Sequence, residues 1–225
     1  MAAAPDTADP LTGESRWPAV AVVLVFLALN VTMRISLPKD GAFGGMPWAL
    51  PAIEVILLIV LATSDPSGPA ERRRLHRAAS ALVGLLVVAA LWATGTLVSD
   101  LVTGASLAND PSQLLAAGGL VWLGNNLAFA LLYWLMDGGG PAARFQRPGA
   151  VDFAFTQHMS PELAAPGWRP VFADYLHLGF TNATAFSPTD VMPLTHRAKF
   201  AMLVQATVAL ALFGLIVARA VNAFT

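Results

Sequence analysis

Side chains with oxygen atoms gather between residues 181 and 190, in a chain that is otherwise mostly apolar. Thr181, Asn182 and Thr184 offer hydroxyl and amide oxygens that could line a polar path for an ion. Asp190 could then attract cations to the mouth of that path, as rings of Asp or Glu do in cation channels. Two simpler interpretations stay open. The threonines and the asparagine could hold helices together, and Asp190 could be a turn or N-cap carboxylate ahead of the last helix.

Further polar residues lie inside the apolar runs of the sequence. Glu54 is an acid within such a run, which makes it a candidate proton or cation site. Its alternative is a carboxyl group near the membrane interface, because it follows Pro47 by only seven residues. Asn125 and Asn126 could line a cavity, although hydrogen bonding between helices is the favoured interpretation.

The remaining chemistry-bearing residues indicate no catalytic centre. The chain has no cysteine, and its four histidines lie in different segments, at His76, His158, His177 and His196. They form no metal-ligand spacing such as His-Glu-x-x-His, and no nucleophile elbow or phosphate-binding glycine loop is present. We therefore expect a protein that is not an enzyme and that has no metal site and no cofactor.

The composition is typical of a membrane protein. Of the 225 residues, 56% are hydrophobic and 12% are charged, about half the charged fraction of an ordinary soluble domain. The mean hydropathy is +0.62. The formal net charge is -1 and the basic residues are scattered, so we expect no nucleic-acid partner. The expected partner is the lipid bilayer.

Five apolar runs are predicted as membrane spans. They cover residues 17–33, 47–63, 78–99, 114–136 and 200–218. The second run is the weakest because it contains Pro51 and Glu54. Residues 1–16 are predicted as a disordered tail, 17–136 as a four-helix transmembrane region and 137–170 as an irregular polar connector. Residues 171–185 are too short and too polar for a span, so residues 171–189 are predicted to form a re-entrant helix and loop.

The basic residues indicate an orientation. With five spans and the N-terminus in the cytoplasm, ten of the thirteen basic residues lie on the cytoplasmic side, including the cluster from Arg72 to Arg77. Arg34, Lys39 and Arg219 lie outside. The expected location is the bacterial inner membrane.

Residues 171–225 contain a short helix, a polar turn ending in Asp-x-x-Pro, a basic cap and a long apolar helix. This order resembles the tetrameric pore-loop cation-channel superfamily, which includes the potassium channels and has a filter pattern Thr-x-x-Thr-Thr-Val-Gly-Tyr-Gly-Asp-x-x-Pro. With Asp190 and Pro193 aligned, Thr181 and Thr184 match two of the family's threonines. The filter itself departs from the family. Its positions hold Ala185, Phe186, Ser187, Pro188 and Thr189.

The departure has a physical meaning. Filter glycines allow successive carbonyls to point into a pore, whereas Ser187 and Thr189 carry a Cβ and Pro188 fixes its own φ. The resemblance thus implies a pore-like helix and loop, but no potassium selectivity. The whole chain is also similar to uncharacterised bacterial multi-pass proteins related to the domain-of-unknown-function 1345 family, on its four spans, glycine-rich connector, Asp-Tyr segment and terminal Ala220-Val221-Asn222.

These patterns predict an all-α membrane protein of about five transmembrane helices plus a re-entrant pore-like helix and loop. The leading hypothesis is permeation of monovalent cations by a homo-oligomer, a tetramer if the resemblance holds. The alternatives are a non-conducting structural or interaction protein and a small secondary transporter that uses Glu54. The charge distribution puts the loop on the cytoplasmic side, whereas pore-loop channels insert it from outside. A second run that does not span would remove this conflict.

Overall fold

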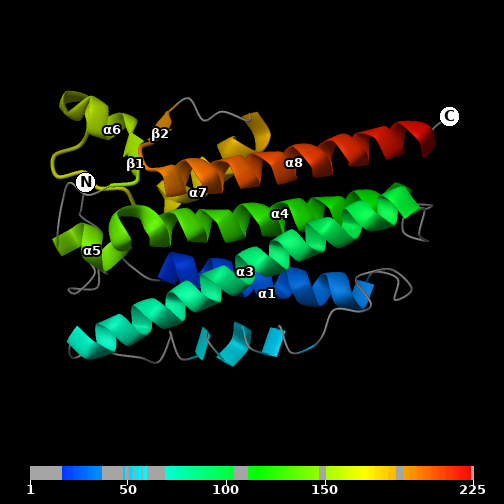
Figure 1. The fold of residues 1–225 in the computed structure, drawn as a ribbon, viewed down its shortest axis with the longest axis horizontal. Coiled ribbons are helices and arrows are strands. Elements are labelled where there is room, and N and C mark those ends of the chain that lie inside the picture. The colour runs from blue at the N-terminus through cyan, green and yellow to red at the C-terminus, as the bar shows by residue number, and fades with distance from the viewer. Residues whose placement is uncertain are drawn as a thin grey trace, which may run out of the picture.

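The computed structural model is a bundle of long helices with a small two-stranded sheet at one end (Figure 1). It describes residues 17–36, 48, 51–52, 54–56, 58–59, 69–103, 111–146, 151–185 and 190–223. The main helices are α1 (Trp17–Ser36), α3 (Pro69–Thr103), α4 (Pro111–Met136), α7 (Phe172–Ala185) and α8 (His196–Ala223). The short elements are η3 (Asp137–Gly139), α5 (Pro141–Gln146), β1 (Phe153–Phe155), α6 (Thr156–Met159), η4 (Pro161–Leu163) and β2 (Val191–Pro193).

Four helices among the described residues, α1, α3, α4 and α8, are long and apolar enough to cross a membrane. They confirm the predicted runs at 17–33, 78–99, 114–136 and 200–218 as long helices. The run at 47–63 is described only in part, and residues 51–52, 54–56 and 58–59 within it are helical. The predicted tail at 1–16 lies outside the described residues.

Helix α4 is the centre of the bundle, and it contacts α1, α3, α7 and α8. One buried cluster combines residues 19–26 of α1, 82–90 of α3 and 127–135 of α4, and a second combines Met33, residues 93–101 and residues 114–121. Helices α1 and α3 therefore run in the same direction, and α4 runs opposite to both. The start of α8 packs against residues 129–133 of α4, so α8 runs parallel to α1 and α3 (Figure 1).

Three consecutive glycines turn the chain at the end of α4. Gly138, Gly139 and Gly140 have φ values of 59°, 83° and 94°, in the left-handed range where a side chain is disfavoured. The turn directs the chain into α5 and then into the connector. The ring of His76 in α3 lies close beside Gly140, which places the N-terminal part of α3 at this end of the bundle.

The connector is more regular than predicted. Residues 153–155 form β1, which pairs antiparallel with β2 so that Phe153 faces Pro193 and Phe155 faces Val191. Phe153 and Phe155 are buried against Tyr133 and Tyr175. A three-residue strand has little local signal, and its pairing partner lies beyond α7, so composition alone indicates an irregular segment here.

Candidate functional site

Helix α7 carries the residues that the sequence singles out, and its start is defined by a local hydrogen bond. Asp174 Oδ2 accepts from the backbone N–H of Val171 at 2.7 Å. The carboxylate lies in the first turn, where it interacts favourably with the helix dipole. Helix α7 then packs against α4 and α8.

One side of α7 is exposed and carries polar groups. His177, Phe180 and Thr184 are exposed at helical spacing, and Thr181 is half-buried beside them. The Thr181 hydroxyl donates to the carbonyl of His177 at 2.9 Å, and the Thr184 hydroxyl donates to that of Phe180 at 2.9 Å. Both hydroxyl protons are thus used in hydrogen bonds to backbone carbonyls of α7. The hydroxyl oxygens keep lone pairs free to accept from water or to contact a cation.

Asp190 lies beside this exposed side of α7. His177 Nε2 is 3.0 Å from Asp190 Oδ2, so the residue that follows the predicted loop contacts the first half of α7. Asp190 does not cap the last helix, because the Thr195 hydroxyl accepts from the N–H of Ala198 at the start of α8. Ala185 ends α7, and the filter-like residues Phe186, Ser187, Pro188 and Thr189 lie outside the described residues.

The other side of α7 is buried against a cluster of amides and one phenol. We call Asn126, Tyr133, Asn182 and Gln205 the interior amide cluster; all four are buried. Gln205 Oε1 accepts from the Tyr133 hydroxyl at 2.6 Å and from Asn182 Nδ2 at 2.8 Å. Gln205 Nε2 donates to the carbonyl of Gly179 at 2.9 Å. The cluster therefore joins α4, α7 and α8 through groups whose hydrogen bonds are satisfied.

The predicted amides of α4 have different roles. Asn126 Oδ1 lies 3.5 Å from Gln205 Nε2, at the edge of hydrogen-bond distance, and Asn126 Nδ2 donates to the carbonyl of Trp122 at 2.9 Å. This agrees with bonding between helices, the favoured interpretation. Asn125 is buried on the same turn, and neither atom of its amide has a hydrogen-bond partner.

Gly179 allows α7 to approach α4 closely. A Cβ at this position would lie 3.3 Å from the carbonyl oxygen of Asn126 and 3.4 Å from the Cβ of Ala130. We expect Gly179→Leu to push α7 away from α4 and to lower the melting temperature in detergent, at a cost of about 1–3 kcal/mol. The matched control is Gly214→Leu in α8, where no atom lies within 4 Å of the added Cβ. Equal melting temperatures for the two variants would contradict this close approach.

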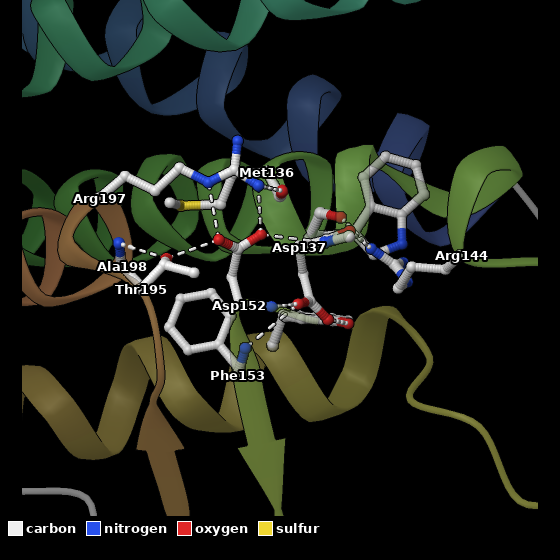
Figure 2. A network of polar contacts seen from close by, with 11 residues as sticks. Met136, Asp137, Arg144, Asp152, Phe153, Thr195, Arg197 and Ala198 are labelled. Carbon is white, nitrogen blue, oxygen red and sulfur yellow. Dashed lines mark hydrogen bonds and ion pairs between the residues drawn. The ribbon is translucent and has the colours of Figure 1, made fainter. Parts of the chain in front are cut away.

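A second polar cluster lies at the end of the bundle that holds the sheet (Figure 2). We call it the two-aspartate cluster, formed by Asp137 and Asp152 with Tyr175, Thr195 and Arg197. Asp137 is fully buried, and its carboxylate accepts from the Tyr175 hydroxyl and from the N–H groups of Asp152 and Phe153. This carboxylate links the end of α4 to α7 and to the connector.

Asp152 links the connector to α8. It accepts from Arg197 Nε at 2.6 Å, from the Thr195 hydroxyl at 2.6 Å and from the N–H of Gly138 at 3.0 Å (Figure 2). Burial by itself raises the pKa of the Asp152 carboxyl, but the hydrogen bonds from Arg197, Thr195 and Gly138, together with the charge of Arg197, outweigh it. The pKa is therefore below its usual value. The sequence reasoning did not single out either aspartate.

Glu54 is buried next to α1. Its side chain is 1% exposed, and Oε1 lies 3.5 Å from Asn30 Nδ2, while Oε2 has no hydrogen-bond partner. Within the described part of the chain, no group of three or more His, Asp or Glu residues is placed to hold a metal ion.

Comparison of the chain with known protein families, with curated proteins and with solved structures gives no match.

Proposed function

We propose that the protein forms a homo-oligomer in the bacterial inner membrane that conducts monovalent cations along the exposed side of α7 and the loop after it. The observation that carries this proposal is the exposed polar side of α7. His177 and Thr184 are exposed on this side, Asp190 contacts His177, and α7 packs against α8, a helix long and apolar enough to span a membrane. Polar groups beside a spanning helix are costly in lipid, so they favour a water-filled path or a polar partner surface.

The exposed face of α8 supports an oligomer around this path. Phe200, Leu203, Leu210, Phe213 and Val217 follow one another at helical spacing and are all exposed in the single chain. Such a face is covered either by lipid or by neighbouring copies. One helix, loop and helix cannot enclose a pore, so the proposed path requires several copies around one axis.

The packing of the second apolar run supports five crossings. Trp48 lies against Arg34, with the guanidinium 4.3 Å from the ring centroid, and Glu54 lies against Asn30. Leu58 then joins the cluster that contains residues 19–26 of α1. Trp48, Glu54 and Leu58 therefore follow α1 in the antiparallel direction, which is the direction needed to return the chain to the start of the parallel helix α3.

The positions of the basic residues support insertion of the loop after α7 from the cytoplasmic side. The start of α3, with Arg74 and Arg77, lies at the end of the bundle that also holds the sheet, the start of α7 and Arg197. The positive-inside rule favours the cytoplasm for this end. With five crossings, the loop enters from the side opposite to the one that pore-loop channels use.

Cation flux into liposomes tests the proposal. We expect the wild-type protein to conduct potassium and sodium, and Asp190→Asn to reduce the flux roughly threefold to tenfold. That range corresponds to the loss of about 1 kcal/mol of attraction between one carboxylate and a cation. The matched control is Glu162→Gln, an exposed carboxylate of η4 that lies outside the loop, which should keep the wild-type flux.

Two results would contradict permeation through the loop. Absence of flux from a folded oligomer would favour the non-conducting interaction protein, an alternative supported by the extensive bonding of the buried side of α7 within its own chain. Flux that is unchanged by Asp190→Asn but lost in Glu54→Gln would favour a small transporter, an alternative supported by the unpartnered oxygen of Glu54.

A further inference from the structure

Glu54 is a buried acid for which the described residues provide no counter-charge. Among these residues it makes no ion pair, and its side-chain hydrogen bond is the 3.5 Å contact with the amide of Asn30. That distance is at the long limit for a hydrogen bond, so the amide stabilises a negative charge only weakly. The second carboxyl oxygen has no partner.

The described residues near Glu54 are apolar, or they are polar residues that contact other groups. Leu58, one turn further along the chain, is buried in the cluster that includes Val23 and Phe26 of α1. Arg34, one turn beyond Asn30 on α1, is the nearest charged residue along that helix, and it lies over the ring of Trp48. No charged side chain of the described residues makes an ion pair or a hydrogen bond with Glu54.

An ionised carboxylate in such a place is unstable relative to the neutral acid. Moving an unpaired charge out of water costs far more than moving a neutral group, and a buried acid without a cation takes up a proton instead. In a membrane the same preference is stronger, because no water is available to solvate the charge. We infer that Glu54 is a proton-binding site, held neutral beside Asn30 of α1.

The same geometry argues for a proton as the ligand and against a metal ion. Sodium, magnesium and calcium require several oxygen ligands around one position. Here one carboxyl group faces the NH₂ of Asn30, a hydrogen-bond donor that repels a cation. A protonated carboxyl needs only one acceptor or none, and it removes the cost of placing a charge in the second run.

Infrared spectroscopy of the purified protein tests this inference, because the C=O stretch of a protonated carboxyl is separate from the bands of a carboxylate. At about pH 6, where an ordinary glutamate with a pKa of about 4.3 is ionised, subtracting the spectrum of Glu54→Gln from that of the wild type should leave a protonated carboxyl band. In alkaline buffer this band should be replaced by carboxylate bands. Asp152→Asn is the matched control, and its difference spectrum at the same pH should contain carboxylate bands only.

Two results would overturn the inference. One is a wild-type minus Glu54→Gln spectrum with only carboxylate bands at about pH 6. The other is failure of Glu54→Gln to fold at that pH, because glutamine closely matches the size and neutrality of a protonated glutamate. The measurement does not involve flux, so its outcome is independent of whether the loop after α7 conducts ions.

Discussion

Asp152→Asn is expected to lower the melting temperature in detergent by about 5–10 °C, which corresponds to about 2–3 kcal/mol for a chain of this size. The carboxylate of Asp152 is buried and accepts from Arg197, Thr195 and the backbone of Gly138. An asparagine keeps one oxygen and replaces the other with a donor that faces these donors. We place the cost below the 3–5 kcal/mol typical of a fully buried pair, because the Arg197 side chain is 60% exposed and stays solvated.

The control for this variant is Glu162→Gln, which makes the same chemical change at an exposed position. Its melting temperature should stay within about 1 °C of the wild type, as expected of a surface substitution. A wild-type melting temperature for Asp152→Asn would show that the two-aspartate cluster does not hold the connector to α8.

The effect of Asp152→Asn should depend on pH in a defined direction. The pKa of Asp152 is lower in the folded protein than its unfolded value of about 3.9, so the carboxylate stabilises the fold fully above that value. This contribution is lost as the pH falls below about 4 toward the folded pKa. The difference in melting temperature between wild type and variant should therefore be largest near neutral pH and should shrink in acid. A difference that grows in acid would contradict the lowered pKa.

The sequence predicts the long helices because each is a run of apolar residues long enough to recognise without its partners. The runs at 78–99 and 114–136 lie within α3 and α4, and the segment at 171–185 becomes the short helix α7. The turn at Gly138 to Gly140 is also visible in the sequence, but its function depends on a contact. The N–H of Gly138 donates to Asp152, which lies beyond α5.

The contacts that position the candidate site join residues far apart in the chain, and periodicity does not report them. Asp152 and Arg197 are 45 positions apart, and Tyr133 and Gln205 are 72 positions apart. His177 illustrates the same limit over a shorter distance. Its spacing from Asp174 suggests a pair on one helical face, yet Asp174 accepts from Val171 and His177 contacts Asp190. The spacing is correct for a pair, but the partner of His177 is Asp190, which lies 13 positions further along the chain.

Gln205→Ala is expected to destabilise the protein by about 3 kcal/mol. Gln205 is fully buried in α8 and bonds to Tyr133 of α4 and to Asn182 and Gly179 of α7. Alanine removes all three bonds and leaves a cavity, and each unsatisfied buried group costs about 1–3 kcal/mol. The total stays moderate because Asn182 keeps its 3.0 Å bond to the carbonyl of Met202. Thr207→Ala, at an exposed position of α8, is the control and should unfold at the wild-type temperature.

A double-mutant cycle with Tyr133→Phe separates the loss of the interior amide cluster from the loss of volume. Tyr133→Phe alone removes one hydroxyl whose bond to Gln205 is 2.6 Å long, and we expect it to cost about 1 kcal/mol, within the range measured for hydrogen bonds between membrane helices. In the Gln205→Ala background that bond no longer exists and the hydroxyl keeps only the 3.4 Å contact from Asn182 Nδ2, so the same substitution should cost much less. Additive costs would mean that the tyrosine and the glutamine act independently. A coupling close to the single-mutant cost would mean that α4 and α8, the two helices that α7 packs against, are joined through this buried amide.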